Sequence, residues 1–298
     1  MSYYSVKQML ADCNEQHTPL WETIMMDDAM EQHSTREVSL QKMHHLWKVM
    51  QTTSQSYSPS DRSHSGLVGG ESARVQQAFQ HGNLIGDAFL NEVIAEALKI
   101  GECNACMKRI VASPTAGSCG ILPAVLIPLS QKEKLSDDKV VEALFVAAGF
   151  GEVIAERASI AGASGGCQAE IGTASAMSAA ALVALMDKSE NYEACADACA
   201  IALSNLLGLV CDPVAGLVEV PCVQRNVAGA LNAIGAANMA LAGIKSQIPA
   251  DEVIDAMGEI GDQMSTDLKE TSRGGLAATP TGKKIAQKLS GTKSQESL

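Results

Sequence analysis

The chain has 298 residues, of which 46% are hydrophobic and only 3% are aromatic. This apolar content is too high for a disordered chain, and a core so poor in aromatic residues must be built from small and aliphatic side chains, which favours closely packed helices. The formal net charge of −12 and the lack of a basic, aromatic-rich stretch argue against nucleic acid as a partner, and the acidic charge also argues against anionic membranes.

The N-terminal sequence MSYYSVKQML has no basic segment followed by an apolar one, so it does not resemble a secretory signal peptide. The uncharged stretch 226–244 is long enough to cross a membrane, but it contains three asparagines and three glycines and no aromatic or basic belt. We interpret it as a buried helix and expect a cytoplasmic chain without membrane contact. Nine cysteines in such a chain indicate thiols, metal ligands or redox chemistry, not a disulfide framework.

The predicted elements are helices joined by glycine-rich turns. Residues 19–52 are predicted to form one long or broken helix, because apolar residues from Leu40 to Met50 recur at three- and four-residue spacing. A polar linker follows over 51–65, and no histidine occurs after His81. Further helices are predicted over residues 86–109, 136–160, 171–187, 189–208, 224–244 and 249–267.

No run of alternating β-branched residues predicts a strand, so the expected fold is all-α, a compact multi-helix body. We expect an N-terminal helical segment and linker over residues 1–60 and a helical catalytic domain over 61–298 that ends in a short polar tail. Five segments rich in Gly, Pro and Ser separate the helices, at 65–70, 113–120, 161–170, 211–222 and 271–275. Each alone could be a tight turn, but five of them favour one shared site, because small residues let backbone N–H groups approach a ligand.

Most cysteines lie inside helical patterns. Cys103 and Cys106 form a CxxC pair, but near the end of a helix and outside any βαβ pattern, so we interpret them as core thiols and not as a redox pair. Cys195 and Cys199 share a helix face and could supply half a zinc site, yet the second half is not evident. We therefore expect them to belong to the core as well.

Cys167, Cys211 and Cys222 differ from the others because each stands at a border between a loop and a helix. Three thiolates without a histidine suit an iron–sulfur cluster better than zinc, although their long spacing alone is a weak signal. Three ligands on a four-iron cluster would leave one iron open, and an open iron is a Lewis acid suited to dehydration. The loop before residue 121 is then the best nest for a substrate carboxylate.

Five long motifs in a fixed order carry a family resemblance. They are SGLVGGESA (65–73), SPTAGSCGILPAVL (113–126), GGCQAEIGTASAMSAAAL (165–182), CDPVAGLVEVPCVQRN (211–226) and DLKETSRGGLA (267–277). The chain closely resembles the α chain of the bacterial iron–sulfur-dependent L-serine dehydratases over roughly residues 60–285. Cys119 and Val68 depart from the residues usual in that family, and neither change removes a proposed cluster ligand.

The resemblance implies β-elimination of water from L-serine, which gives pyruvate and ammonia. The implied cofactor is a [4Fe–4S] cluster held by Cys167, Cys211 and Cys222, with one iron that lacks a protein ligand, and pyridoxal phosphate is not involved. From the loops we expect six substrate-binding residues, which are Ser65, Gly66, Ser113, Thr115, Gly117 and Ser118.

The resemblance also implies a partner. One-chain members of the family carry a regulatory α/β domain before the cluster-binding region, and this sequence does not, so we expect the α chain of a hetero-oligomer with a separate β chain. Removal of the α-proton of serine needs a general base. We leave the catalytic base unknown and expect it from the β chain, with His64, which lies in a glycine loop, as the fallback.

Three alternatives remain open at this point. A related iron–sulfur lyase acting on L-cysteine or L-threonine differs in pocket size and leaving group. A pyridoxal-phosphate ammonia-lyase needs a Schiff-base lysine in an α/β fold, for which Lys269 and the glycine loops are the only support. A non-catalytic zinc or electron-transfer protein needs a fourth metal ligand.

Overall fold

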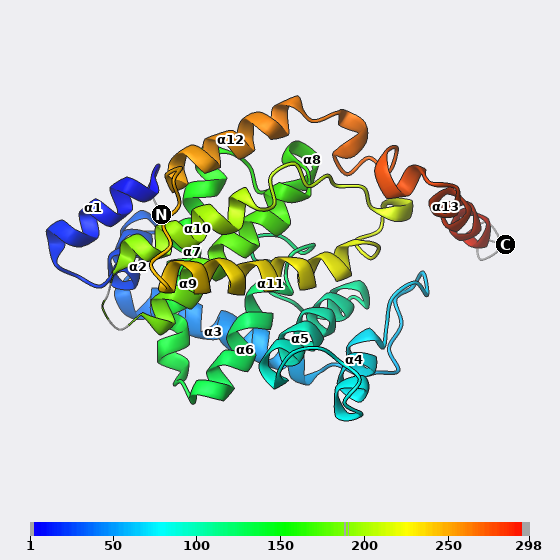
Figure 1. Ribbon diagram of the computed structural model, residues 1–298, viewed down its shortest axis with the longest axis horizontal. Helices are drawn as coiled ribbons and strands as arrows, with labels where there is room; N and C mark the ends of the chain where they lie inside the picture. Colours follow the sequence, from blue (N-terminus) through cyan, green and yellow to red (C-terminus); the bar gives the residue numbers. More distant parts are fainter. Residues whose placement is uncertain (1–2, 188, 190, 294–298) are drawn as a thin grey trace.

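The computed structural model describes residues 3–187, 189 and 191–293, and these residues form a body of α-helices (Figure 1). The first half contains α1 (Val6–Gln16), α2 (Leu20–Glu31), α3 (Arg36–Gln55), α4 (Glu71–Gln80), α5 (Ala88–Ala105), α6 (Ile121–Glu133) and α7 (Asp137–Arg157). The second half contains α8 (Gly162–Gly165), α9 (Thr173–Met186), α10 (Tyr192–Ser204), α11 (Cys222–Leu241), α12 (Ala250–Gln263) and α13 (Pro280–Lys293). The described residues contain no strand, so the all-α prediction is confirmed.

Helix α9 forms the centre of the molecule and contacts α6, α7, α10 and α11. Every residue from Thr173 to Val183 is buried, and most are Ala or Ser. A helix that is apolar all round is stable only when other helices surround it, and small side chains let these helices come close. At Gly229 of α11, for example, a Cβ would lie only 2.5 Å from Ile121 Cδ1.

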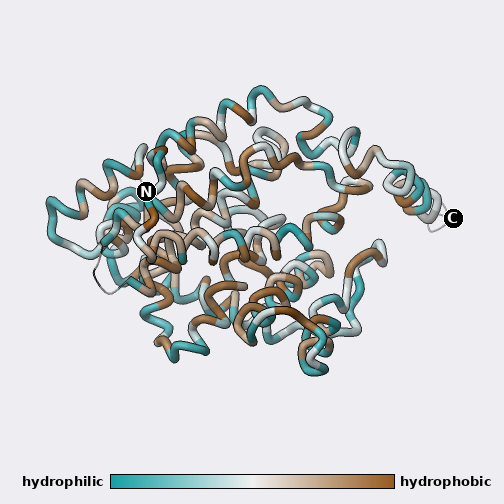
Figure 2. The backbone as a smooth tube through the Cα atoms, in the orientation of Figure 1, coloured by the Kyte–Doolittle hydropathy of each residue, from teal (hydrophilic) through white to brown (hydrophobic). Residues whose placement is uncertain are grey.

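One helical stretch, Gln168–Met186, is long and apolar enough to cross a membrane, and 78% of it is buried inside the protein. It is the central helix of the bundle with the turn that precedes it. The stretch predicted to be buried, 226–244, lies mostly in α11, which turns one face to the core and leaves the other accessible. The outer helix α12 likewise alternates hydrophilic and hydrophobic residues along its length (Figure 2).

The helix predicted over 19–52 is broken in two. It is interrupted at His33, which has a left-handed φ of 48°, and α3 starts anew because the Thr35 side chain accepts a hydrogen bond from the Val38 N–H. The N-terminal helices join the main core: Trp47 is buried and donates to Asp137 Oδ1 at 2.6 Å. The other predicted helices are all present, with ends that differ by a few residues; most are shorter, whereas α11 begins two residues earlier, at Cys222.

Five helices lie outside the predicted helical ranges: α1, α4, α6, α8 and α13. Helix α4 is polar, and its start depends on a distant residue, since the buried Glu102 accepts hydrogen bonds from the N–H groups of Gly70 and Ser72. The C-terminal tail was predicted to be frayed from residue 290, but 290–293 complete α13, at one end of the body (Figure 1). Residues 294–298 lie outside the described residues.

Candidate metal centre

Cys167 lies where a glycine-rich turn meets the central helix. Gly166 turns the chain with a φ of 76°, and a Cβ at this position would lie 2.6 Å from Met264 Sδ. Cys167 then precedes a π-helical turn, η1 (Gln168–Gly172), which leads directly into α9. Because the core holds α9 in place, the turn continuous with it sets the positions of Cys167 and of Glu170, which lies three residues after Cys167. Turns of this kind are frequent at functional sites.

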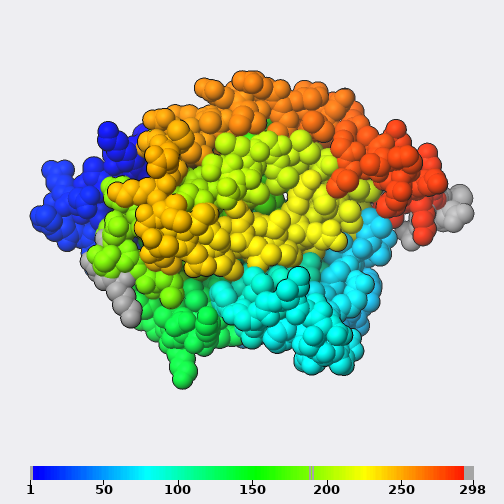
Figure 3. Space-filling model, viewed as in Figure 1, coloured from blue at the N-terminus to red at the C-terminus, as the bar shows by residue number. Residues whose placement is uncertain are grey.

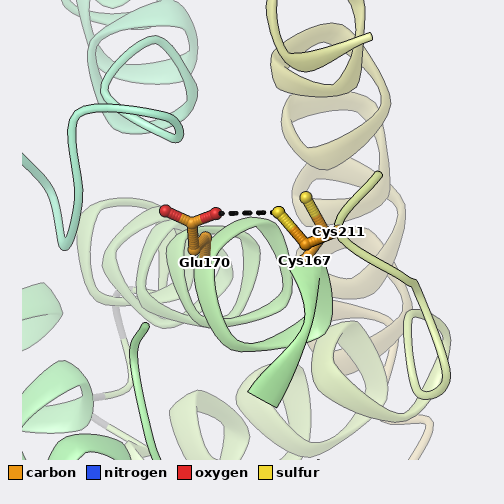
Figure 4. Close-up of side chains that lie close together, drawn as sticks. All are labelled: Cys167, Glu170 and Cys211. Atoms are coloured by element: carbon orange, nitrogen blue, oxygen red, sulfur yellow. Dashed lines mark hydrogen bonds between the residues drawn. The ribbon is translucent and has the colours of Figure 1, made fainter. Parts of the chain in front are cut away.

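Three donor atoms converge at this turn. The Sγ atoms of Cys167 and Cys211 and a carboxylate oxygen of Glu170 all lie within 4.8 Å of one another (Figure 4). The Cys211 thiol points to Glu170 Oε2 at 4.0 Å. A Cβ at Gly162 would lie 2.7 Å from Glu170 Oε2 and 3.1 Å from Cys211 Sγ, so only glycine leaves room beside the group. Two thiols and a carboxylate at these distances can hold a metal.

Cys211 is held by a segment that lies far along the chain. Its N–H donates to the Leu268 carbonyl at 2.8 Å, and its own carbonyl accepts from the Glu270 N–H at 2.8 Å. The next side chain, Asp212, is buried and accepts from the Leu276 N–H at 2.7 Å. Cys211 and Asp212 are therefore hydrogen-bonded to residues on both sides of the predicted loop 271–275, and the Ser272 hydroxyl within that loop donates to the Pro213 carbonyl at 2.7 Å.

Arg225 of α11 connects the two cysteine-bearing segments. Its Nη1 donates to Cys167 Sγ at 3.3 Å and to the Val210 carbonyl at 2.8 Å, and its Nη2 donates to Asp212 Oδ1 at 2.8 Å. A hydrogen bond from Cys211 and the charge of Arg225 lower the pKa of Cys167 despite its burial. The same bond between the two thiols, together with burial, raises the pKa of Cys211. Cys167 is thus the thiol that ionises first, beside a fixed cation.

Cys222 is the first residue of α11 and is buried. Burial raises the pKa of the Cys222 thiol to about 12, and the negative charges of Cys167 and Glu170 act in the same direction. It does not belong to the group of atoms within 4.8 Å of one another. The structure therefore brings Cys167 and Cys211 together directly, with Cys222 as a buried neighbour.

Loop 113–120 reaches the same carboxylate. Thr115 Oγ1 donates to Glu170 Oε1 at 2.7 Å, but burial still raises the pKa of Glu170 above its ordinary value. The side-chain amide of Asn226 in α11 donates to the Gly117 carbonyl at 2.9 Å and so fixes the loop. Of the six predicted substrate residues, Thr115 and Gly117 thus lie beside the Cys–Glu–Cys group.

The two serines of this loop are both buried. The Ser118 hydroxyl is 3.2 Å from Thr115 Oγ1, within the loop itself. The Ser113 hydroxyl has no hydrogen-bond partner among the described residues. A buried hydroxyl without a partner is costly, and this distinguishes Ser113 from Ser118.

The first glycine loop lies against the 211–222 segment, which is yellow in the space-filling view and lies between the light-blue loop and the orange C-terminal segment (Figure 3). The hydroxyls of Ser63 and Ser65 both donate to Glu219, whose side chain is buried. Gly66 is exposed and has a φ of 74°. His64 is exposed between the two serines. Ser65 thus contacts the cysteine loop through Glu219, Gly66 is exposed next to it, and the described contacts include none between His64 and the donor atoms.

The remaining cysteines lie apart from this group. In the described part of the chain, Cys167, Glu170 and Cys211 form the one cluster of three potential metal ligands. Cys103, Cys195 and Cys199 are buried in helices, as the sequence predicted for core thiols. Cys119 is also buried, and burial raises its pKa to about 12.

Glu170, Asp212 and Arg225 were not predicted from the sequence to be site residues. The charge pattern of the sequence could have indicated Glu170, because it is the only charged residue between Arg157 and Asp187. Arg225 is likewise the only Lys or Arg in residues 189–244. A lone charge in an apolar, glycine-rich segment must be paired or functional when it is buried.

The donor set fits a metal group bound through thiolates. Soft sulfur ligands without histidine are typical of iron–sulfur clusters, and Gly162 leaves space beside them. Hydrogen bonds connect all five glycine-rich segments around this group. The fold and the site thus define an all-helical protein with a candidate metal centre built from two buried thiols and a carboxylate.

Residues 15–277 match the family model described as "Serine dehydratase alpha chain". The chain is 44% identical over 289 residues to the probable L-serine dehydratase alpha chain of Bacillus subtilis, covering 97% of this chain and 96% of that protein. It is 39% identical to the L-serine dehydratase alpha chain of Peptoniphilus asaccharolyticus, over 94% of this chain and 96% of that one. L-serine dehydratase 1 of Escherichia coli is 36% identical over 92% of this chain, which spans 61% of that protein. The chain belongs to the serine dehydratase alpha chain family, so the resemblance recognised in the sequence is confirmed.

Proposed function

We propose that this chain is the α chain of an iron–sulfur L-serine dehydratase. L-Serine loses its α-proton and its hydroxyl group as water, and the resulting aminoacrylate becomes an imine that takes up water to give pyruvate and ammonia. The observation that carries the proposal is the Cys167–Glu170–Cys211 group enclosed by the glycine loops of a serine dehydratase family member.

Cys167, Cys211 and Cys222 would hold the [4Fe–4S] cluster as thiolates. When bound, such a cluster supplies a Lewis acid that polarises a substrate hydroxyl group. Arg225 supports the site, because its hydrogen bond and charge favour the thiolate of Cys167 and its ion pair with Asp212 orients the loop of Cys211. This arrangement does not use pyridoxal phosphate.

The glycine loops would bind and orient the amino acid. Loop 113–120 offers the unpartnered Ser113 hydroxyl together with Thr115, which is already bonded to Glu170. Ser65 and Gly66 would close the site from the side of the cysteine loop, to which Ser65 is connected through Glu219. Bound in this way, serine is separated from bulk water, which strengthens each polar contact.

The base that removes the α-proton would come from a β chain, which makes the active enzyme a hetero-oligomer. No histidine follows His81 in the sequence, and His64 is exposed. L-Serine is favoured over L-cysteine or L-threonine because the relatives that this chain resembles over nearly their whole length are named for serine.

The test is anaerobic reconstitution of the two-chain protein with iron and sulfide, followed by iron and sulfide analysis and a pyruvate assay with L-serine. Alanine at Cys167, Cys211 or Cys222 should remove iron and activity together. Cys199→Ala, a buried thiol outside the group, is the matched control and should keep both. Full iron and activity in any of the first three variants, or zinc instead of iron in the wild type, would contradict the proposal.

A further inference from the structure

Glu170 is a partly buried carboxylate without a basic partner. No Lys, Arg or His among the described residues forms an ion pair with it, although it lies in the interior where a lone charge is unfavourable. The positive charge of Arg225 acts on Glu170 through space and lowers its pKa, against the larger effect of burial. The guanidinium donors are, however, directed to Cys167, Val210 and Asp212. When it is ionised, Glu170 therefore has no direct ion-pair partner among the described residues, beside the candidate metal centre.

The two oxygens of Glu170 have different surroundings. Oε1 accepts the hydrogen bond from Thr115, which fixes the orientation of the carboxylate. Oε2 faces the sulfur of Cys211 (Figure 4). Two glycines lie close to the carboxylate: a Cβ would lie 2.7 Å from Oε2 at Gly162 and 3.3 Å from Oε1 at Gly117. The chain thus orients this carboxylate through Thr115 and places no side chain at two neighbouring positions, Gly162 and Gly117.

We propose that Glu170 binds the ammonium group of the substrate amino acid, an inference that rests on the proposed function. In L-serine the ammonium group is on the carbon between the carboxylate and the CH2OH group. When those two groups approach the metal centre, the ammonium group comes within a few bond lengths of it. An ammonium ion that leaves water needs a charged acceptor, and Glu170 Oε2 is the carboxylate oxygen adjacent to the centre.

This assignment makes Glu170 a determinant of specificity for amino acids over hydroxy acids. A site built to accept hydrogen bonds from an NH₃⁺ group rejects analogues that lack it, because its acceptor is then left buried and unpaired. The pair L-serine and 3-hydroxypropanoate tests this directly, since the two differ only in the amino group.

The experiment uses the reconstituted two-chain enzyme with Glu170→Gln, which keeps the shape of the side chain and removes its charge. Binding of L-serine should weaken about tenfold or more, as expected for the loss of a charge-assisted hydrogen bond. Binding of 3-hydroxypropanoate, measured by calorimetry, should change by no more than about twofold. L-Serine is also titrated by calorimetry if turnover is lost. The iron content per chain should equal that of the wild type.

Two further variants keep the result interpretable. Glu170→Asp retains the charge and should recover part of the preference for L-serine, even if the variant is less stable. Glu270→Gln removes an exposed neighbouring charge that acts on Glu170 through space, and it should leave the preference for L-serine over 3-hydroxypropanoate unchanged. Equal weakening of both ligands in Glu170→Gln, no weakening, or a loss of iron that identifies Glu170 as a metal ligand would overturn the inference. Failure of the proposed function is seen separately, as a wild-type enzyme without iron or without pyruvate formation.

Discussion

Replacement of Asp212 by alanine tests how the cysteine loop is held. The side chains of Asp212 and Arg225 are 4% and 14% exposed, and they form an ion pair at 2.8 Å. The change removes the acceptor for Arg225 Nη2 and for the Leu276 N–H and leaves a cation in the interior. Loss of one partner of a buried pair costs about 3–5 kcal/mol, and we expect about 3 kcal/mol because Arg225 keeps its bond to Val210.

The assay is urea unfolding of the metal-free chain, with the iron retained after reconstitution as a second measurement. A loss of about 3 kcal/mol lowers the melting temperature of a chain of this size by about 6–12 °C. Asp267→Ala is the matched control, because Asp267 pairs with Arg273 in the neighbouring segment but the two side chains are 57% and 62% exposed. Removal of that exposed pair should cost less than about 1 kcal/mol. If Asp212→Ala unfolded at the same urea concentration as the control, Arg225 and Asp212 would not hold this loop.

Two other predictions concern the thiols and the partner chain. Burial raises the pKa of Cys103 from 9.0 to about 11, so its contribution to stability is complete below pH 9 and is lost as the pH rises through 11. Urea unfolding of the metal-free chain between pH 9 and pH 11 should show a free energy of unfolding that falls as the pH rises. The fall should be smaller in Cys103→Ser than in Cys106→Ser, the control at a partly exposed cysteine. An equal fall in both variants would contradict the raised pKa of Cys103. The reconstituted chain alone should form almost no pyruvate from L-serine until a β chain is added, and full turnover without it that disappears in His64→Ala would identify His64 as the base.

Much of the fold was predictable from the sequence because its core helices have regular apolar faces. The helix predicted over 136–160 occurs as α7, and Ser136 caps it as its position suggests. Helix α4 was missed because its start is stabilised by Glu102, which is remote in the sequence, and not by its own composition. The division of the chain at residue 60 stays a prediction.

The candidate site was predictable as a set of loops but not as a set of contacts. The spacing and small residues of the loops indicated one shared site, and hydrogen bonds do connect them. The roles of Glu170 and Arg225 depend on contacts with residues 55 and 13 positions away, Thr115 and Asp212, and a single sequence does not reveal such contacts. The sequence showed three cysteines at borders between loops and helices. Only the structure shows that Cys167 and Cys211 lie close together and that Cys222 lies outside their group.

The two halves of the site are held by different kinds of interaction. Cys167 and Glu170 lie on a turn continuous with α9, which is buried on every side, so they can move only if the core repacks. Cys211 is held by backbone hydrogen bonds to a C-terminal segment and by the pair of Asp212 with Arg225, contacts that open at a lower free energy than a packed helix does. Arg225 contacts both Cys167 and Asp212. Loss of the Asp212 side chain should therefore disturb the alignment of the donor atoms more than it disturbs the packing of the helices. The core determines where one side of the candidate metal centre lies, and the polar contacts of Arg225 determine whether the other side meets it.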